Sequence, residues 1–204
     1  MRQLLTGYLR IFTDRPYISF IIAFTLNQVC AALIWVLLSE HAKHNYGVIE
    51  SLYGFIPVTN ALMVVFLQSP VTLRTKNRSP LPVLALGSLI YGVAAASIAL
   101  GRGFWGFWIS MVIMTAGELM LMPTATTYAA NLAPAHMRGR YMSIFGLTWG
   151  VAMGIGPLLG GFLRDTVSLS APWLMGGVAG LAAALMFAAM AKRAATEVTE
   201  GAEQ

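Results

Sequence analysis

Long uninterrupted runs of apolar residues dominate the chain, and short polar segments separate them. Six runs can be marked, at 16–39, 51–73, 81–100, 104–131, 141–163 and 172–191. A helix needs about 20 residues to cross the hydrocarbon core of a bilayer, and each run reaches that length. The alternating pattern of a membrane β-barrel is missing. We therefore expect transmembrane helices, each of which satisfies its own backbone hydrogen bonds.

The composition excludes soluble classes of protein. The 204 residues are 57% hydrophobic and 10% charged, whereas soluble domains carry about 25% charged residues. The only charged residue inside a run is Glu118. The sequence pI of about 9.7 does not indicate a nucleic-acid partner, because the basic residues lie at the ends of apolar runs, as expected where a bilayer is the partner. The fold class is thus an all-α membrane protein.

The segments outside the runs leave little room for anything else. The first run follows basic residues, but it is too long for the apolar region of a signal peptide and lacks a small-residue cleavage site, so we expect it to be retained. Cys30 is the single cysteine and is expected to pack as a small apolar residue. The polar, acidic segment 192–204 is expected to be a disordered cytoplasmic tail, which leaves 1–191 as the six-helix domain.

The distribution of lysine and arginine predicts the orientation, because cytoplasmic loops are enriched in both. If the N-terminus lies inside, only three of these residues fall outside the cell: Lys43, Arg102 and Arg164. The inner side receives Arg2, Arg10, Arg15, Arg74, Lys76, Arg78, Arg138, Arg140, Lys192 and Arg193. We therefore predict a multi-pass protein of the cell (plasma or inner) membrane with both termini in the cytoplasm.

The segments 60–70, 74–78 and 84–92 resemble the eighth and ninth helices, in the second half of the chain, of transporters of the major facilitator superfamily. Leu132-Ala133-Pro134 with Arg138-Gly139-Arg140-Tyr141 resembles its link between helices ten and eleven. Gly117-Glu118 with Pro123 is similar to the tenth helix of its drug/proton antiporter group. The glycines of 150–161 match the spacing of the antiporter glycine motif.

The resemblance implies half of a twelve-helix transporter. The signatures of the family's first half are missing, since Arg74-Thr75-Lys76-Asn77-Arg78 is only a degenerate form of the first-half loop motif and no arginine lies in the fourth run. In this superfamily each half contains a 3+3 inverted repeat, and the substrate site lies between the halves. The implied partners are the lipid bilayer, a small-molecule substrate, and an N-terminal transporter half or a second copy of the chain.

Glu118 is the main candidate for chemistry. It lies near the expected bilayer centre, where a charge costs at least about 2.5 kcal/mol. We therefore expect its carboxyl to be protonated, paired or facing water. The functional interpretation is proton coupling or recognition of a cationic substrate. The structural alternative is a hydrogen bond to a neighbouring helix or to the carbonyl of Leu119, which Pro123 leaves without an amide donor.

Other polar, sulfur and aromatic residues in the runs are candidates for the wall of a substrate cavity. Amides inside a membrane face protein or a cavity, methionine adapts to varied ligands, and paired aromatic rings stack on planar or cationic ligands. Interhelical packing is the alternative for each. The candidates are Asn27, Gln28, Asn60, Thr115, Met122, Phe145 and Trp149. The third and sixth runs, which have the fewest polar residues, are expected against lipid.

The glycines of the fifth run are assigned first to helix packing and flexing. Small residues four apart let helices approach closely, and a proline adds a kink. These residues are Gly150, Gly154, Gly156, Pro157, Gly160 and Gly161. Arg138 and Arg140, in a cytoplasmic loop, satisfy the orientation rule, and the family resemblance adds a possible gating role.

The predicted function is proton-coupled efflux of hydrophobic or cationic compounds, in which the chain acts as a C-terminal transporter half. The alternative is a six-helix accessory or interaction protein that no longer transports. An enzyme is not expected, because the histidines lie in loops and no nucleophile–base pair is present. No cofactor and no metal are predicted.

Overall fold

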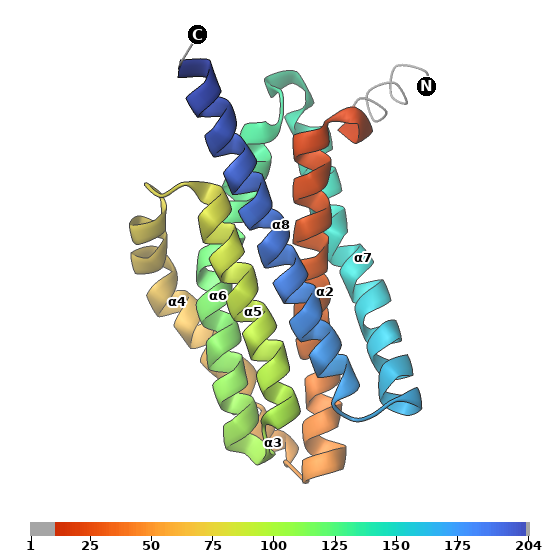
Figure 1. Ribbon diagram of the computed structural model, residues 1–204. Coiled ribbons are helices and arrows are strands. Elements are labelled where there is room, and N and C mark those ends of the chain that lie inside the picture. Colours follow the sequence, from red (N-terminus) through yellow and green to blue (C-terminus); the bar gives the residue numbers. More distant parts are fainter. Residues whose placement is uncertain (1–10, 203–204) are drawn as a thin grey trace.

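The computed structural model describes residues 11–202 and forms an elongated helical bundle (Figure 1). Within these residues no strand is found. The helices are α2 (Arg15–Tyr46), α3 (Glu50–Tyr53), α4 (Phe55–Thr75), α5 (Pro80–Leu100), α6 (Gly103–Leu132), the 3-10 turn η1 (Ala135–Met137), α7 (Arg138–Thr166) and α8 (Ala171–Ala202). Within residues 11–202, six helical segments are long and apolar enough to span a membrane, which confirms the predicted fold class.

The helix ends differ from the apolar runs by several residues, because caps and turns set them. Asp14 accepts a hydrogen bond from the amide of Tyr17 and caps α2, which continues well beyond the first run. Gly47, with φ of 64°, ends α2 in the left-handed conformation that glycine adopts freely. The second run is divided at Gly54 into the short α3 and the long α4.

Residues 192–202, which the sequence assigned to a disordered cytoplasmic tail, continue α8 as a helix. Alanine, lysine, arginine and glutamate are abundant in this segment, and all four favour helix. Polarity ends the membrane span there but does not end the helix. Residues 203 and 204 of the predicted tail lie outside the described residues.

The centre of the bundle is α5, which packs against α6 on one side and α8 on the other. Glycines bring these backbones together: a Cβ added to Gly180 would lie 2.5 Å from the Cα of Gly92. The expectation that the run 81–100 lies against lipid is therefore wrong for one side of the helix, since α5 is half buried within the protein. The least buried spans are instead α4 with its preceding turn, and α7.

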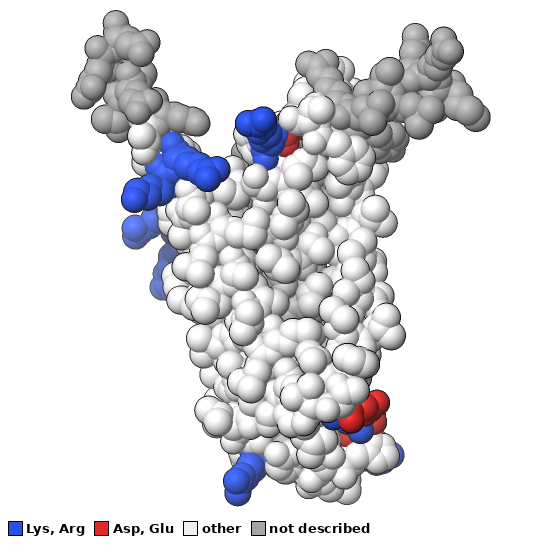
Figure 2. Space-filling model, turned by 45° about the vertical axis from the view of Figure 1, so that its right-hand side comes forward, with Lys and Arg blue, Asp and Glu red and all other residues white. Residues whose placement is uncertain are grey.

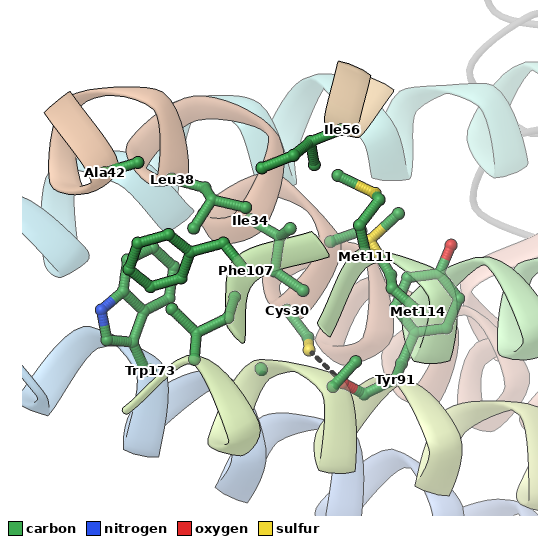
Figure 3. Close-up of a cluster of buried hydrophobic side chains, with 14 of the residues drawn as sticks. Cys30, Ile34, Leu38, Ala42, Ile56, Tyr91, Phe107, Met111, Met114 and Trp173 are labelled. Carbon is green, nitrogen blue, oxygen red and sulfur yellow. Dashed lines mark hydrogen bonds between the residues drawn. The ribbon is translucent and has the colours of Figure 1, made fainter. Parts of the chain in front are cut away.

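Two clusters of buried side chains fill the bundle, one toward each end. Figure 3 shows the cluster that contains Trp173, Phe107, Met111 and Tyr91. Cys30 lies buried within it, as predicted, and its Sγ contacts the backbone oxygen of Tyr91 at 3.4 Å. Charged side chains lie at the two ends of the face seen in Figure 2, with an uncharged surface between them, as a membrane-spanning protein requires.

Candidate functional site

A cavity of about 460 Å³ lies beside the middle of α6, between α6, α2 and α7. Its lining is mainly aromatic and apolar, with one carboxyl and one amide. The lining residues are Phe24, Gln28, Ala31 and Trp35 of α2, Tyr91 of α5, Glu118 and Met122 of α6, and Phe145, Gly146, Thr148 and Trp149 of α7. Among the described residues that line it, Glu118 is the only acid.

Glu118 lies at the midpoint of α6, about 21 Å of helix from either end. Its Oε2 accepts a hydrogen bond of 2.7 Å from Nδ2 of Asn60 on α4. The same nitrogen donates to Oγ1 of Thr115 at 3.0 Å, and Thr115 donates to the carbonyl of Met111. The carboxyl is therefore held from behind by a short polar chain, while its other side faces the cavity.

The carbonyl of Leu119 has a different partner from the one that the sequence suggested. Pro123 removes the amide that would bond to it, and Nε2 of Gln68 on α4 donates to it at 3.0 Å. Glu118 therefore does not bond to this carbonyl, and of its two structural alternatives the hydrogen bond to a neighbouring helix, here from Asn60, is the one observed. Gln68 was missed because nothing in the sequence places this part of α4 beside Pro123 of α6.

Flat rings form the opposite wall of the cavity. Phe24 of α2 and Phe145 of α7 stack with ring centroids 4.7 Å apart and an angle of 26° between planes. Trp149 follows Phe145 by one helical turn and is 39% exposed. Trp35 and Tyr91 also line the cavity, although the sequence placed the run that contains Tyr91 against lipid. A ligand in this space would lie between aromatic faces and a carboxyl.

Of the predicted cavity residues, Gln28, Met122, Phe145 and Trp149 line the cavity. Asn60 and Thr115 lie behind Glu118 and are buried. Asn27 does not reach the cavity: its side chain is fully buried, and its amide has no hydrogen-bond partner within the described residues. Neighbouring residues point about 100° apart around a helix, and on α2 Gln28 lies on the side that lines the cavity while Asn27 is enclosed by protein.

Side-chain hydrogen bonds and an ion pair link the helices near the cavity into two pairs, α2 with α7 and α4 with α6. Asp14 accepts a hydrogen bond from Tyr141, and Arg164 pairs with Glu40 at 2.8 Å. These contacts join α2 to α7 near both ends. Asn60, Gln68 and Thr59 join α4 to α6, the last by accepting a bond of 2.8 Å from Nε1 of Trp108. The cavity lies beside Glu118, between the two pairs.

The glycines of α7 divide into two faces. A Cβ on Gly156 would lie 3.2 Å from Cβ of Ala32, and one on Gly160 would lie 2.5 Å from Leu33. These two glycines let α7 approach α2, and Pro157 lies between them. Gly150, Gly154 and Gly161 have nothing within 4 Å of that position, so they pack against no described part of this chain. Arg138 and Arg140 lie in the first turn of α7.

Comparisons with known proteins give a consistent family. Over 122 residues the chain is 29% identical to the uncharacterized transporter YhjO of Bacillus subtilis, a match that covers 60% of this chain and 30% of the relative. A Na⁺, Li⁺, K⁺/H⁺ antiporter of Planococcus maritimus is 28% identical over 53% of this chain and 26% of its own length. The quinolone resistance protein NorA of Staphylococcus aureus is 28% identical over 51% and 26%.

A solved structure of a POT family transporter in complex with 5-aminolevulinic acid has the same fold, with a TM-score of 0.75 and 17% identity. The match covers 93% of this chain and 45% of that one, so the chain spans less than half the length of these proteins. The fold is therefore that of a transporter half. The family model described as Major Facilitator Superfamily matches residues 20–204, and the chain belongs to this superfamily.

Proposed function

We propose that this chain supplies one wall of the substrate site in a proton-coupled efflux transporter of hydrophobic, cationic compounds. The observation that carries the proposal is the cavity, which is lined by a single carboxyl at the middle of α6 and by stacked aromatic rings. Two relatives, named as an antiporter and as a quinolone resistance protein, support it.

The chemistry of the cavity favours a particular substrate class. A cation near Glu118 would gain charge pairing that is strong away from water. Phe145 and Trp149 offer ring faces that attract cations and stack on planar groups. Met122 is flexible and fits varied shapes. Together these groups suit a flat, hydrophobic cation rather than a sugar, which would need many hydrogen-bonding partners.

Asn60 equips Glu118 to gain and lose a proton. Its amide carries two donors on nitrogen and an acceptor oxygen. The nitrogen donates to the carboxyl, an arrangement that suits the ionised form. After a half-turn of the amide, the oxygen would accept from the protonated carboxyl. Asn60 can thus bond to the carboxyl in either charge state.

A second half completes the site in this proposal. The spans that contain α4 and α7 are the least buried, and the open side of α7 carries Gly150 and Gly154, with no described atom near either. Glycines four apart allow close approach of another helix. We infer that these faces contact an N-terminal half, or a second copy when that half is absent, and that rocking occurs between the two bodies.

The experiment is transport of ethidium, a flat hydrophobic cation, by proteoliposomes that hold the complete transport assembly. With an imposed pH gradient, wild type should accumulate ethidium against its concentration gradient. Glu118→Gln keeps the hydrogen bond to Asn60 but fixes the charge at zero, so accumulation should disappear or lose its pH dependence. Glu118→Asp should keep partial coupling.

Exchange of ethidium without a pH gradient is the control, because rocking alone supports it. Glu118→Gln should bind ethidium more weakly than wild type does. At an ethidium concentration high enough to saturate the variant, exchange should survive. Wild-type, fully pH-dependent accumulation by this variant would remove Glu118 from the mechanism. Absence of ethidium movement in wild type would contradict the substrate class, and absence of any transport would favour the accessory-protein alternative.

A further inference from the structure

A second hollow lies on the other side of the bundle, between α4 and α5 at the end where these helices are joined. Although the two helices are consecutive, they barely contact each other, and each packs on α6 instead. Gly87 and Gly117 draw α5 onto α6, since a Cβ on Gly117 would lie 2.9 Å from the carbonyl of Gly87. This close approach leaves a groove beside α4, with a volume of about 450 Å³.

The groove has a charged mouth and an apolar floor. Arg74 on the last turn of α4 and Arg78 in the following loop line the mouth. Leu86 of α5 and Met120 of α6 line the deeper part, together with Val83. Leu86 is 48% exposed. The groove is thus charged near the helix ends and apolar further along the helices.

The two arginines have no acidic partner among the described residues. Both are exposed, and neither side chain forms an ion pair or hydrogen bond within the part of the chain that the structure describes. No acidic residue lies between Arg74 and Glu118 in the sequence. Two uncompensated guanidinium groups over a hollow favour an anion with several acceptor oxygens, which arginine binds bidentately.

The depth of the groove matches a lipid. The 21 residues of α4 span about 31 Å, so Arg74 lies at the level of the headgroups when the helix crosses the bilayer. Leu86 lies six residues into α5, about 9 Å below that level. A phosphate at the mouth therefore places an acyl chain along the apolar floor, whereas a free phosphate would leave the floor uncovered.

We propose that this groove binds the phosphate headgroup and one acyl chain of an anionic phospholipid. Basic pockets between transmembrane helices suit such headgroups, and the cytoplasmic leaflet, which this end faces in the proposed orientation, is rich in anionic lipids. The site is separate from the Glu118 cavity, shares no lining residue with it, and does not depend on the proposed transport function.

The test is native mass spectrometry of the chain released from bilayers of equal dioleoyl-phosphatidylglycerol and dioleoyl-phosphatidylcholine. Wild type should retain mainly phosphatidylglycerol. The double variant Arg74→Gln/Arg78→Gln should retain roughly 25-fold less phosphatidylglycerol, since each basic side chain at an anionic surface contributes about a factor of five. Arg102→Gln, which removes a cation from the opposite end, is the matched control and should behave as wild type.

Two further arms separate a lipid from a free anion. Leu86→Trp fills the groove and leaves both arginines in place, so it should reduce retention of phosphatidylglycerol. An excess of inorganic phosphate should not displace the lipid. Unchanged retention in the double variant or in Leu86→Trp, equal retention of phosphatidylcholine by wild type, or displacement by phosphate would each overturn the proposal.

Discussion

At the scale of single residues, the hydrogen bonds between α4 and α6 provide partners for polar groups of α6, namely the carboxyl of Glu118 and the carbonyl of Leu119. Pro123 lies one turn beyond Glu118 and frees the carbonyl of Leu119, and Gln68 occupies that carbonyl from α4. A polar group in hydrocarbon has no water to bond with. The amide of Gln68 therefore joins α4 to α6 beside Pro123. Glu118 is then bonded to Asn60 and not to this carbonyl.

Replacement of Gln68 by leucine should destabilise the chain by roughly 1 kcal/mol, because it leaves the carbonyl of Leu119 unpaired. The midpoint of thermal unfolding in mild detergent measures the loss. The control is the same change in a Pro123→Ala background, where residue 123 supplies its own amide. There the cost of Gln68→Leu should nearly vanish. An equal cost in both backgrounds would show that Gln68 does not act through this carbonyl.

At the scale of helices, glycine allows close packing on some helix faces and leaves open space on others. Gly180 faces backbone atoms of Gly92 that cannot move aside, and Gly160 faces the flexible ends of Leu33 and Leu37. A Cβ on Gly154 would have no atom of the described residues within 4 Å. Helix spacing in the bundle is therefore set by the glycines of α5, α6 and α8, and by part of α7.

Gly180→Ala should lower the unfolding temperature, since overpacking costs about 1–3 kcal/mol and outweighs the gain of about 1 kcal/mol in helix propensity. Gly154→Ala should leave the unfolding temperature unchanged or raise it, because only the propensity gain remains. Thermal unfolding of both variants in detergent measures the difference. A larger loss in Gly154→Ala than in Gly180→Ala would contradict the packing described for the two helices.

The bulkier Gly154→Leu extends this comparison to assembly. It should fold as well as wild type, because the position is open, but it should weaken self-association or co-purification with a second half. Wild-type association by Gly154→Leu would show that this face of α7 is not the contact surface. Crosslinking in native membranes provides the measurement.

At the scale of the whole molecule, charge sets the orientation. Both ends of the described chain lie at the same end of the bundle (Figure 1), and so does the loop that carries Arg74 and Arg78. The opposite end carries the ion pairs of Lys43 with Glu50 and Arg164 with Glu40. The excess of basic residues at the first end places it in the cytoplasm in our proposal.

Single-cysteine labelling in a Cys30→Ala background tests this orientation. His44→Cys and Asn77→Cys replace exposed residues at opposite ends. A membrane-impermeant maleimide should label His44→Cys from outside intact cells and Asn77→Cys only in inverted vesicles. Labelling of His44→Cys from the cytoplasmic side alone would invert the topology and place the lipid groove in the outer leaflet.

The sequence by itself determined the number of spans, the class of fold and the position of the carboxyl. Runs of about 20 apolar residues can only be helices in lipid, and a lone acid such as Glu118 in one of them is conspicuous because every neighbour is apolar. The resemblance to the family could also be inferred from the sequence, because the loop and glycine motifs that carry it are short segments of the chain.

Only the tertiary structure decided which sides of the helices meet. The sequence grouped Asn27 with Gln28, yet one is enclosed in protein and the other lines the cavity. It also assigned Tyr91 to lipid, and it gave no reason to pair Gln68 with Leu119. In a soluble helix polarity marks the outer face, but in a membrane helix lipid and protein interior are equally apolar. Rotation about each helix axis is therefore set by packing, and packing becomes visible only when the neighbouring helices are in place.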